Sequence, residues 1–339
     1  MTTGPEAEEA LAGWLAGHVE RLAAPLRIDR LGAGQSNITS VVTDAEGRQW
    51  ILRCPPPGAP AGAHDVHREV RILRALAGTS VPVPVVVAAG ADAAGIGGAF
   101  CVMERVRGVA LADERDAGAL SPQERGRLSV ETVEVLARIH DLDPDSVGLG
   151  NLGRRDGYLD RQIDRTRRNW EAWGGGSAAA GAWRECLRRL TGAVPRQQRV
   201  VIAHGDYRLS NLLVEDGGIT AVLDWELCTL GDPLADLAWL VDDWRSPGDP
   251  AITMPSPTRV GGFASRERLI ADYAARTGLD VGGLGYYRAF THWKAATLLQ
   301  GVLLRRRSGS LGDHGALDLI DLEHTIAYLL DAALAHVRS

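Results

Sequence analysis

The spacing of apolar residues divides the chain into an early part with a period of two and a later part with a helical period. Alternating apolar and polar positions in the first 104 residues predict short strands. A helix is expected at 62–77, because Val66, Val70 and Leu73 recur on one face, and an amphipathic helix is expected at 5–23. The predicted strands are 26–31, 38–43, 48–54, 85–89 and 99–103, which together form a small antiparallel sheet.

Helical periodicity dominates from residue 105 onward. Ser121-Pro122-Gln123-Glu124 has the form of a capping box with proline at the first helical position, and a buried apolar stripe follows it. The glycine-rich segment 174–181 separates two helices, and its role stays open. Further helices are expected at 158–173, 182–190, 233–244, 266–277, 286–306 and 314–337.

The residues most suited to chemistry gather between positions 200 and 240. An apolar run at 200–203 predicts a buried strand that ends at His204-Gly205-Asp206. Two more strands, 212–214 and 219–223, are joined by the hairpin signal Asp216-Gly217-Gly218, and the second ends at Asp224. Asp206, Asn211 and Asp224 therefore lie at strand ends around one small hairpin, from which they can point toward a common place.

This set of side chains suits phosphoryl transfer. The reaction needs oxygen ligands for Mg²⁺ and a group that orients the attacking hydroxyl. Asn211 and Asp224 fit the first task, and Asp206 fits the second as the catalytic residue. Either His-x-Asp or Asp-Trp alone is typical of an ordinary strand-end turn, so the prediction depends on the joint pattern.

The segments HGDYRLSNLL and VLDWELCTLGDPLADLAWL resemble the aminoglycoside phosphotransferase family. They are most similar to its branch related to the kinase-like domains of acyl-CoA dehydrogenase family members 10 and 11. The resemblance implies an α+β, two-lobed protein-kinase-like fold with ATP and Mg²⁺ as cofactors. A small antiparallel sheet would form the N-terminal nucleotide-binding lobe (1–104), and a mainly helical lobe (105–339) would carry catalysis and the substrate.

The N-terminal lobe supplies the expected nucleotide-binding residues. Glycines in the 32–37 loop allow the backbone to approach a phosphate, although a plain hairpin would have the same pattern. Arg53 stands where kinases place a lysine, and Glu69 needs a cation partner on its apolar helix face, for which Arg53 is suited. By the resemblance, Met103 lines the adenine slot and Glu104 and Val106 contact the adenine edge. The complete set is Gly32, Gly34, Gln35, Ser36, Asn37, Arg53, Glu69, Met103, Glu104 and Val106.

The acceptor is a small molecule with a hydroxyl group, and the resembling branch favours a hydroxyacyl-CoA or a hydroxy acid. Lys294 would suit an anionic acceptor, although a salt bridge within the lobe is an equal alternative. Asp242-Asp243 would suit a cationic antibiotic, yet such pairs more often lie on a solvated face. An aminoglycoside or macrolide phosphotransferase is therefore the alternative function, and a catalytically silent nucleotide-binding module is a second one because of Arg53. A dinucleotide-binding oxidoreductase lacks the required strand-helix-strand context.

The composition limits the classes of binding partner and the cellular location that are expected for the protein. The net charge is −6 and no large basic cluster is present, which argues against nucleic acid as a partner. No apolar stretch reaches the roughly 20 residues of a membrane span, and residues 1–10 lack the pattern of a signal peptide. The four cysteines are isolated, which favours reduced thiols and a cytoplasmic location. The sequence leaves the oligomeric state open.

Asp236, in the predicted helix 233–244, has an expected structural role. It is expected to hold the 204–211 loop through backbone amides or Arg208.

Overall fold

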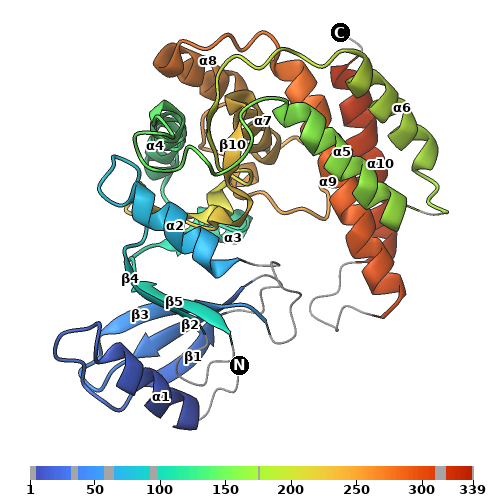
Figure 1. The fold of residues 1–339 in the computed structure, drawn as a ribbon. Helices are drawn as coiled ribbons and strands as arrows, with labels where there is room; N and C mark the ends of the chain where they lie inside the picture. The colour runs from blue at the N-terminus through green and yellow to red at the C-terminus, as the bar shows by residue number, and fades with distance from the viewer. Residues whose placement is uncertain are drawn as a thin grey trace. The chain divides into compact units, whose positions relative to one another are not determined.

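The computed structural model describes residues 5–31, 37–56, 65–91, 98–174, 176–309 and 318–337. Its backbone forms two compact units (Figure 1). Unit 1 contains Met1–Val109 and Thr220–Glu226, and unit 2 contains Ala110–Ile219 and Leu227–Ser339. The segment Thr220–Glu226, which sequence reasoning placed in the second lobe, joins unit 1 because Thr220 Oγ1 donates to Arg107 O (2.6 Å) and Val222 N donates to Pro82 O (2.8 Å).

Unit 1 is built on the small antiparallel sheet that the alternating pattern predicted. Its strands are β1 (Arg27–Leu31), β2 (Ile38–Thr43), β3 (Gln49–Cys54), β4 (Val86–Ala91) and β5 (Ala99–Glu104). They follow the spatial order β1-β2-β3-β5-β4, with every neighbouring pair antiparallel. β3 is central and pairs with β2 and β5, so its residues are held on both sides by backbone hydrogen bonds.

Two helices cover this sheet. In α1 (Pro5–Leu15), Leu11 and Leu15 are fully buried in a core that also contains Leu52 and Phe100. The prediction that this helix reaches residue 23 is wrong: it ends at Leu15, and His18 Nδ1 bonds the Trp14 carbonyl (3.0 Å) just beyond that end. The second helix, α2 (Val66–Leu76), begins at the Asp65 N-cap and packs on β4 and β5.

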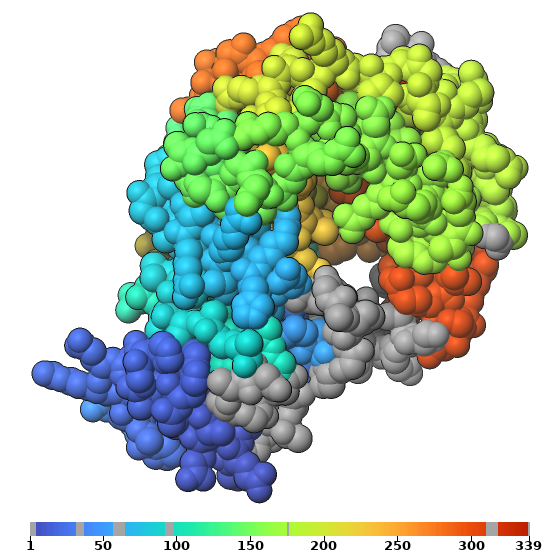
Figure 2. Space-filling view, in the orientation of Figure 1, coloured from blue at the N-terminus to red at the C-terminus, as the bar shows by residue number. Residues whose placement is uncertain are grey.

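Unit 2 is mainly helical, as expected. Tryptophans join three of its helices: Trp170 stacks on Trp183 with ring centroids 4.8 Å apart, and Trp183 lies 5.0 Å from Trp293. Figure 1 shows α9 and α10 side by side, and Figure 2 shows the α6 side chains on an outer face. The helices are α3 (Glu114–Gly118), α4 (Pro122–Asp141), α5 (Tyr158–Trp173), α6 (Ala180–Gly192), α7 (Pro233–Asp243), α8 (Arg266–Thr277), α9 (Leu284–Arg307) and α10 (Leu319–His336).

Short strands and 3-10 turns connect these helices. Both hydrogen bonds of the predicted capping box at Ser121 and Glu124 are present at the start of α4. β7 (Val201–Ala203) pairs antiparallel with β10 (Thr229–Gly231). The other connecting elements are β6 (Val109–Ala110), β8 (Leu212–Glu215), β9 (Gly218–Val222) and the 3-10 turns η1 (Leu209–Asn211), η2 (Trp225–Leu227) and η3 (Pro257–Val260).

Truncating the centre of the unit 1 core tests this packing. Leu52→Ala removes a side chain with 0% exposure and should lower the free energy of unfolding by about 2–5 kcal/mol, through lost burial and a residual cavity. Leu31→Ala, on the same sheet but at a residue with 44% exposure, should change it by less than about 0.5 kcal/mol. Urea denaturation followed by circular dichroism measures both, and equal effects would contradict the assigned core.

Candidate active site

The loop after β7 carries the first predicted catalytic group. β7 is fully buried and leads the chain to His204-Gly205-Asp206. Gly205 has φ 85°, and a Cβ on it would lie 2.9 Å from the carbonyl oxygen of Leu227. Only glycine fits this backbone without strain and without that clash. The sharp change of direction after the strand is therefore a property of this residue.

Asp236 of α7 holds the backbone of this loop. Its carboxylate accepts hydrogen bonds from His204 N (2.6 Å) and Gly205 N (2.8 Å), and His140 Nε2 lies 3.3 Å away. Burial raises the pKa of Asp236, but the hydrogen bond and charge of His140, with the backbone amide, outweigh it and leave the pKa below its usual value. The expectation that Asp236 fixes the loop through backbone amides is confirmed.

Asp206 has a hydrogen-bond donor on each carboxylate oxygen. Trp239 Nε1 donates to Oδ1 (2.7 Å), and Asn211 Nδ2 donates to Oδ2 (2.9 Å) and to the Asp206 carbonyl (2.8 Å). Both amide hydrogens of Asn211 are thus used within the protein. Its Oδ1 makes no hydrogen bond with the residues that the structure describes. The structure brings Asp206 and Asn211 together, while their roles in catalysis and metal binding stay predictions.

One face of α7 contacts this loop at three points. Besides Asp236 and Trp239, Asp243 forms an ion pair with Arg208 at 3.4 Å. These α7 residues are spaced i, i+3 and i+7, so they lie on the same side of the helix. The sequence analysis gave this role to Asp236 alone; it named Asp243 only as a possible contact of a cationic acceptor, and it gave Trp239 no role. The signal available was the spacing of Asp, Trp and Asp on a helix that is otherwise almost entirely apolar.

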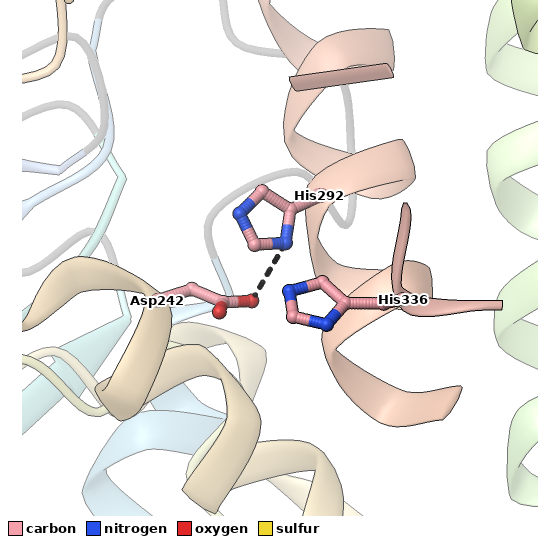
Figure 3. A group of neighbouring side chains, drawn as sticks. All are labelled: Asp242, His292 and His336. Atoms are coloured by element: carbon pink, nitrogen blue, oxygen red, sulfur yellow. Dashed lines mark ion pairs between the residues drawn. The ribbon is translucent and has the colours of Figure 1, made fainter. Parts of the chain in front are cut away.

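Asp242, a predicted substrate residue, is occupied by partners within unit 2. Arg288 Nε lies 2.6 Å from its Oδ1, and His292 Nδ1 lies 3.1 Å from its Oδ2. Figure 3 shows His336 beside this pair. The side chain of Asp242 is only 12% exposed, so the alternative that it lies on a solvated face is wrong. The three side chains are of metal-binding types and their ligand atoms lie within 4.8 Å of one another, yet Arg288 already neutralises the carboxylate.

Lys294, the other predicted substrate residue, borders a cavity of about 90 Å³ beside Gly205. Arg165 of α5 is the second charged group in its lining, and the described lining residues include no carboxylate. Lys294 Nζ lies 4.7 Å from the centroid of the Trp239 ring, and burial lowers the pKa of Lys294. The alternative of a salt bridge is wrong for the described residues, whose ion pairs do not include Lys294.

Unit 1 contains the second group of predicted site residues. Arg53 Nη1 of β3 pairs with Glu69 Oε1 of α2 at 2.5 Å, as the apolar surroundings of Glu69 predicted. Burial raises the pKa of Glu69, although Arg53 opposes the shift. Arg53 Nη2 also lies 3.8 Å from Asp224 Oδ1. The arginine therefore joins a helix carboxylate to the predicted metal ligand.

Three buried polar atoms in this group have no hydrogen-bond partner among the described residues: Arg53 Nε, Glu69 Oε2 and Asp224 Oδ1. Such atoms are costly unless a ligand, ion or water satisfies them. Asp224 also has φ 60°, the left-handed region that residues other than glycine seldom occupy. Unsatisfied atoms and local strain at the same place are typical of functional sites.

The remaining nucleotide-binding predictions divide into two groups. Gly32, Gly34, Gln35 and Ser36 lie outside the described residues. Asn37 is 5% exposed and its Oδ1 is buried without a partner among the described residues. Met103 is buried in β5, Val106 is half-buried, and Glu104 N donates to Val85 O (2.9 Å). Their contacts with a nucleotide stay predictions.

A profile of the phosphotransferase enzyme family (APH) matches residues 27–289. The chain belongs to this family. Mouse acyl-CoA dehydrogenase family member 10 is 33% identical over 310 residues, which are 89% of this chain and 28% of that protein. Human acyl-CoA dehydrogenase family member 11 is 33% identical over 295 residues, 85% of this chain and 37% of that protein. This phosphotransferase thus spans only about a third of those relatives.

Solved structures confirm the kinase-like fold of this phosphotransferase. A Ralstonia eutropha protein, provisionally assigned as an aminoglycoside phosphotransferase, is 30% identical with a TM-score of 0.81, and the match covers 97% of this chain and 98% of that one. Aminoglycoside phosphotransferase APH(4)-Ia, in complex with AMP-PNP and hygromycin B, is 19% identical over the same shares of both chains, with a TM-score of 0.62. The family, fold class and kinase-like phosphotransferase class predicted from sequence are confirmed.

No helix of the described residues is both long and apolar enough to cross a bilayer.

The burial of the Asp243 carboxyl predicts a specific pH dependence of stability. Burial raises the pKa of Asp243 to about 6, against the opposing charge of Arg208. The folded state therefore binds more protons than the unfolded state from about pH 4 to pH 6, and the stabilisation from this carboxyl declines as pH rises through that range. Asp243→Asn should remove this decline, which is on the order of 3 kcal/mol at most.

Urea midpoints of the wild type and Asp243→Asn, measured from roughly pH 4 to pH 7.5, test the sign. The variant should gain on the wild type as pH rises. Asp272→Asn, at a carboxylate of α8 that pairs with Arg268 on the surface, is the matched control. A difference between wild type and Asp243→Asn that does not vary with pH would contradict the assignment.

Proposed function

We propose that this phosphotransferase moves the γ-phosphoryl group of ATP, with Mg²⁺, to a hydroxyl of an anionic small molecule. A hydroxyacyl-CoA or a hydroxy acid is the favoured acceptor. The observation that carries the proposal is the Asp206 carboxylate, held by two donors in a loop that borders a cavity with Lys294 and Arg165 as its charged groups. Both features lie within unit 2.

Asp206 would accept and orient the proton of the acceptor hydroxyl. A carboxylate has about four lone-pair positions, and the two donors occupy one on each oxygen. The remaining positions can receive the hydroxyl while the two hydrogen bonds keep the carboxylate from rotating. Positioning of this kind contributes more to phosphoryl transfer than covalent chemistry by the protein does.

Asn211 and Asp224 are the residues proposed to hold the metal. Asp224 Oδ1 is buried without a hydrogen-bond partner, and the Asn211 amide nitrogen is used within the protein so that its oxygen is left over. Both are hard oxygen donors, which fits Mg²⁺. Bound Mg²⁺ supplies positive charge that neutralises the phosphates. Arg53, held by Glu69, would contribute a further positive charge at the nucleotide.

The charge of the cavity supports an anionic acceptor. A polycationic aminoglycoside would require acidic side chains to bind its ammonium groups. Asp242 is already paired with Arg288, and the described residues that line the cavity at Lys294 include no carboxylate. The names of the relatives, acyl-CoA dehydrogenase family members 10 and 11, favour the same acceptor class, because they refer to acyl-CoA chemistry in those longer proteins.

An antibiotic phosphotransferase remains the second candidate. The Streptomyces fradiae aminoglycoside 3′-phosphotransferase is 29% identical over 68% of this chain and 81% of that protein.

A catalytically silent nucleotide-binding module is the third candidate. The Arg53–Glu69 ion pair weighs against it, because the arginine makes the carboxylate contact for which a lysine would otherwise be expected.

Removing the proposed base should stop transfer. Asp206→Asn keeps the side-chain volume but loses the negative charge, so kcat should fall by at least about 10²-fold. Turnover is measured as ADP release with Mg²⁺-ATP and a panel of hydroxyacyl-CoAs, hydroxy acids, aminoglycosides and macrolides. Asp272→Asn is the matched control and should keep wild-type turnover. Unchanged kcat in Asp206→Asn would exclude the mechanism, and turnover of antibiotics alone would favour the second candidate.

Neutralising the cavity should weaken binding of the acceptor. Lys294→Met should raise KM for an anionic acceptor at least about tenfold, because the charge is lost in a partly desolvated site. Arg165→Met should act in the same direction, and KM for ATP should not change in either variant. Arg167→Met, on the same helix but with its charge at the surface, is the control. Equal KM values in all three variants would contradict an anionic acceptor at this cavity.

A further inference from the structure

Trp239 contacts both of the groups that the proposed function assigns to the acceptor. Its indole N–H donates to Asp206 Oδ1 at 2.7 Å, and its ring lies beneath Lys294 Nζ at 4.7 Å from the centroid. We propose that Trp239 is a positioning residue that fixes the direction of the Asp206 carboxylate and its separation from Lys294. The inference rests on the proposed function and adds to it a determinant of acceptor shape.

The first contact constrains the base. A hydrogen bond to an ionised acceptor is shorter and stronger than a neutral one, and 2.7 Å is at the short end of that range. Asn211 holds the other oxygen from the opposite end of the same loop. With one donor on each oxygen, the carboxylate has a single orientation toward the acceptor hydroxyl. Asn211 alone would leave rotation about the bond to Cβ less restricted.

The second contact constrains the cation. Lys294 is on α9, where burial lowers its pKa, and no ion pair of the described residues includes it. Attraction between the ammonium group and the indole face replaces part of the hydration that burial removes. The ring therefore determines where the ammonium group rests. Phenylalanine would offer the face without the donor, and a polar side chain would offer the donor without the face.

The position of Trp239 on α7 makes these two constraints rigid. Asp236, one turn earlier, accepts backbone hydrogen bonds from the loop, and Asp243, one turn later, pairs with Arg208. The opposite side of the helix is buried in unit 2 through Leu234, Leu237 and Val241. The indole ring is thus anchored on both sides of its sequence position. An acceptor must then carry its hydroxyl and its anionic group at the spacing that Asp206, Trp239 and Lys294 define.

Two substitutions separate the two contacts. Trp239→Phe keeps an aromatic face but removes the donor, so kcat should fall about 10- to 100-fold while KM for the acceptor stays within about twofold. Trp239→Leu removes both, so KM for the acceptor should also rise, by about three- to tenfold. Trp244→Phe is the matched control, because its indole N–H donates to the Ala264 carbonyl, away from Asp206. It should leave kcat and KM unchanged.

A Trp239→Phe enzyme with wild-type kcat would overturn the inference. So would a Trp239→Phe enzyme in which KM rises and kcat does not, because a merely structural ring would give that pattern. Thermal unfolding of each variant, measured in parallel, identifies any loss of folded protein. Asp206→Asn turnover, measured as above, tests the proposed function separately.

A measurement without an acceptor tests the hydrogen bond itself. In protein with ¹⁵N-labelled tryptophan, the indole N–H of Trp239 is assigned by its loss in Trp239→Phe, and its hydrogen exchange is followed by NMR. Asp206→Ala removes the acceptor atom and should speed exchange at Trp239 at least about tenfold, while exchange at Trp244 is unchanged. Equal hydrogen-exchange rates at the Trp239 indole N–H in the wild type and in Asp206→Ala would overturn the inference. If exchange at Trp239 is faster in Asp206→Ala but the wild-type enzyme transfers no phosphate to any acceptor of the panel, the hydrogen bond is supported and only the proposed function is contradicted.

Discussion

The arrangement of unit 2 around its candidate site depends on one buried carboxylate. Asp236 is 1% exposed and accepts hydrogen bonds from the backbone amides of His204 and Gly205 in the sharp turn after β7. His140 beside it compensates for the burial of the negative charge. With the backbone held at this point, α7 can present its next two polar residues to the rest of the loop. The orientation of Asp206 is a consequence of how that helix is anchored.

Unit 1 shows the complementary situation, in which charges are paired but not fully satisfied. Arg53 uses Nη1 for Glu69 and faces Asp224 with Nη2, yet a nitrogen or oxygen of each of these residues remains buried without a hydrogen bond among the described residues. A network left in this state is less stable than an apolar one of the same volume. Under the proposed function, an anionic nucleotide and its cation would satisfy these atoms and stabilise unit 1 on binding.

The sequence predicted the parts of the structure that repeat and the residues that follow strand ends. Periodicity identified the five strands of unit 1 and gave both ends of α5 and α8, because amphipathic patterns are local. It extended α1 too far, because a side-chain bond from His18 near the helix end has no periodic signal. Trp239 and Arg165 were missed because their importance arises from packing between helices that are distant in sequence. Asp242 was misjudged for the same reason, since Arg288 and His292 come from α9.

Charge compensation within unit 2 bears directly on the acceptor. Each acidic residue of α7 near the loop has a partner in the same unit: Asp236 has a hydrogen bond to His140, Asp242 pairs with Arg288, and Asp243 pairs with Arg208. Lys294 has an aromatic ring in place of a carboxylate. The acidic residues of α7 are therefore paired within the unit, whereas Lys294 and Arg165 are the charged groups that line the cavity. A polycationic acceptor would have to compete for carboxylates that are already paired, whereas an anionic acceptor would find an ammonium group with no ion pair to break.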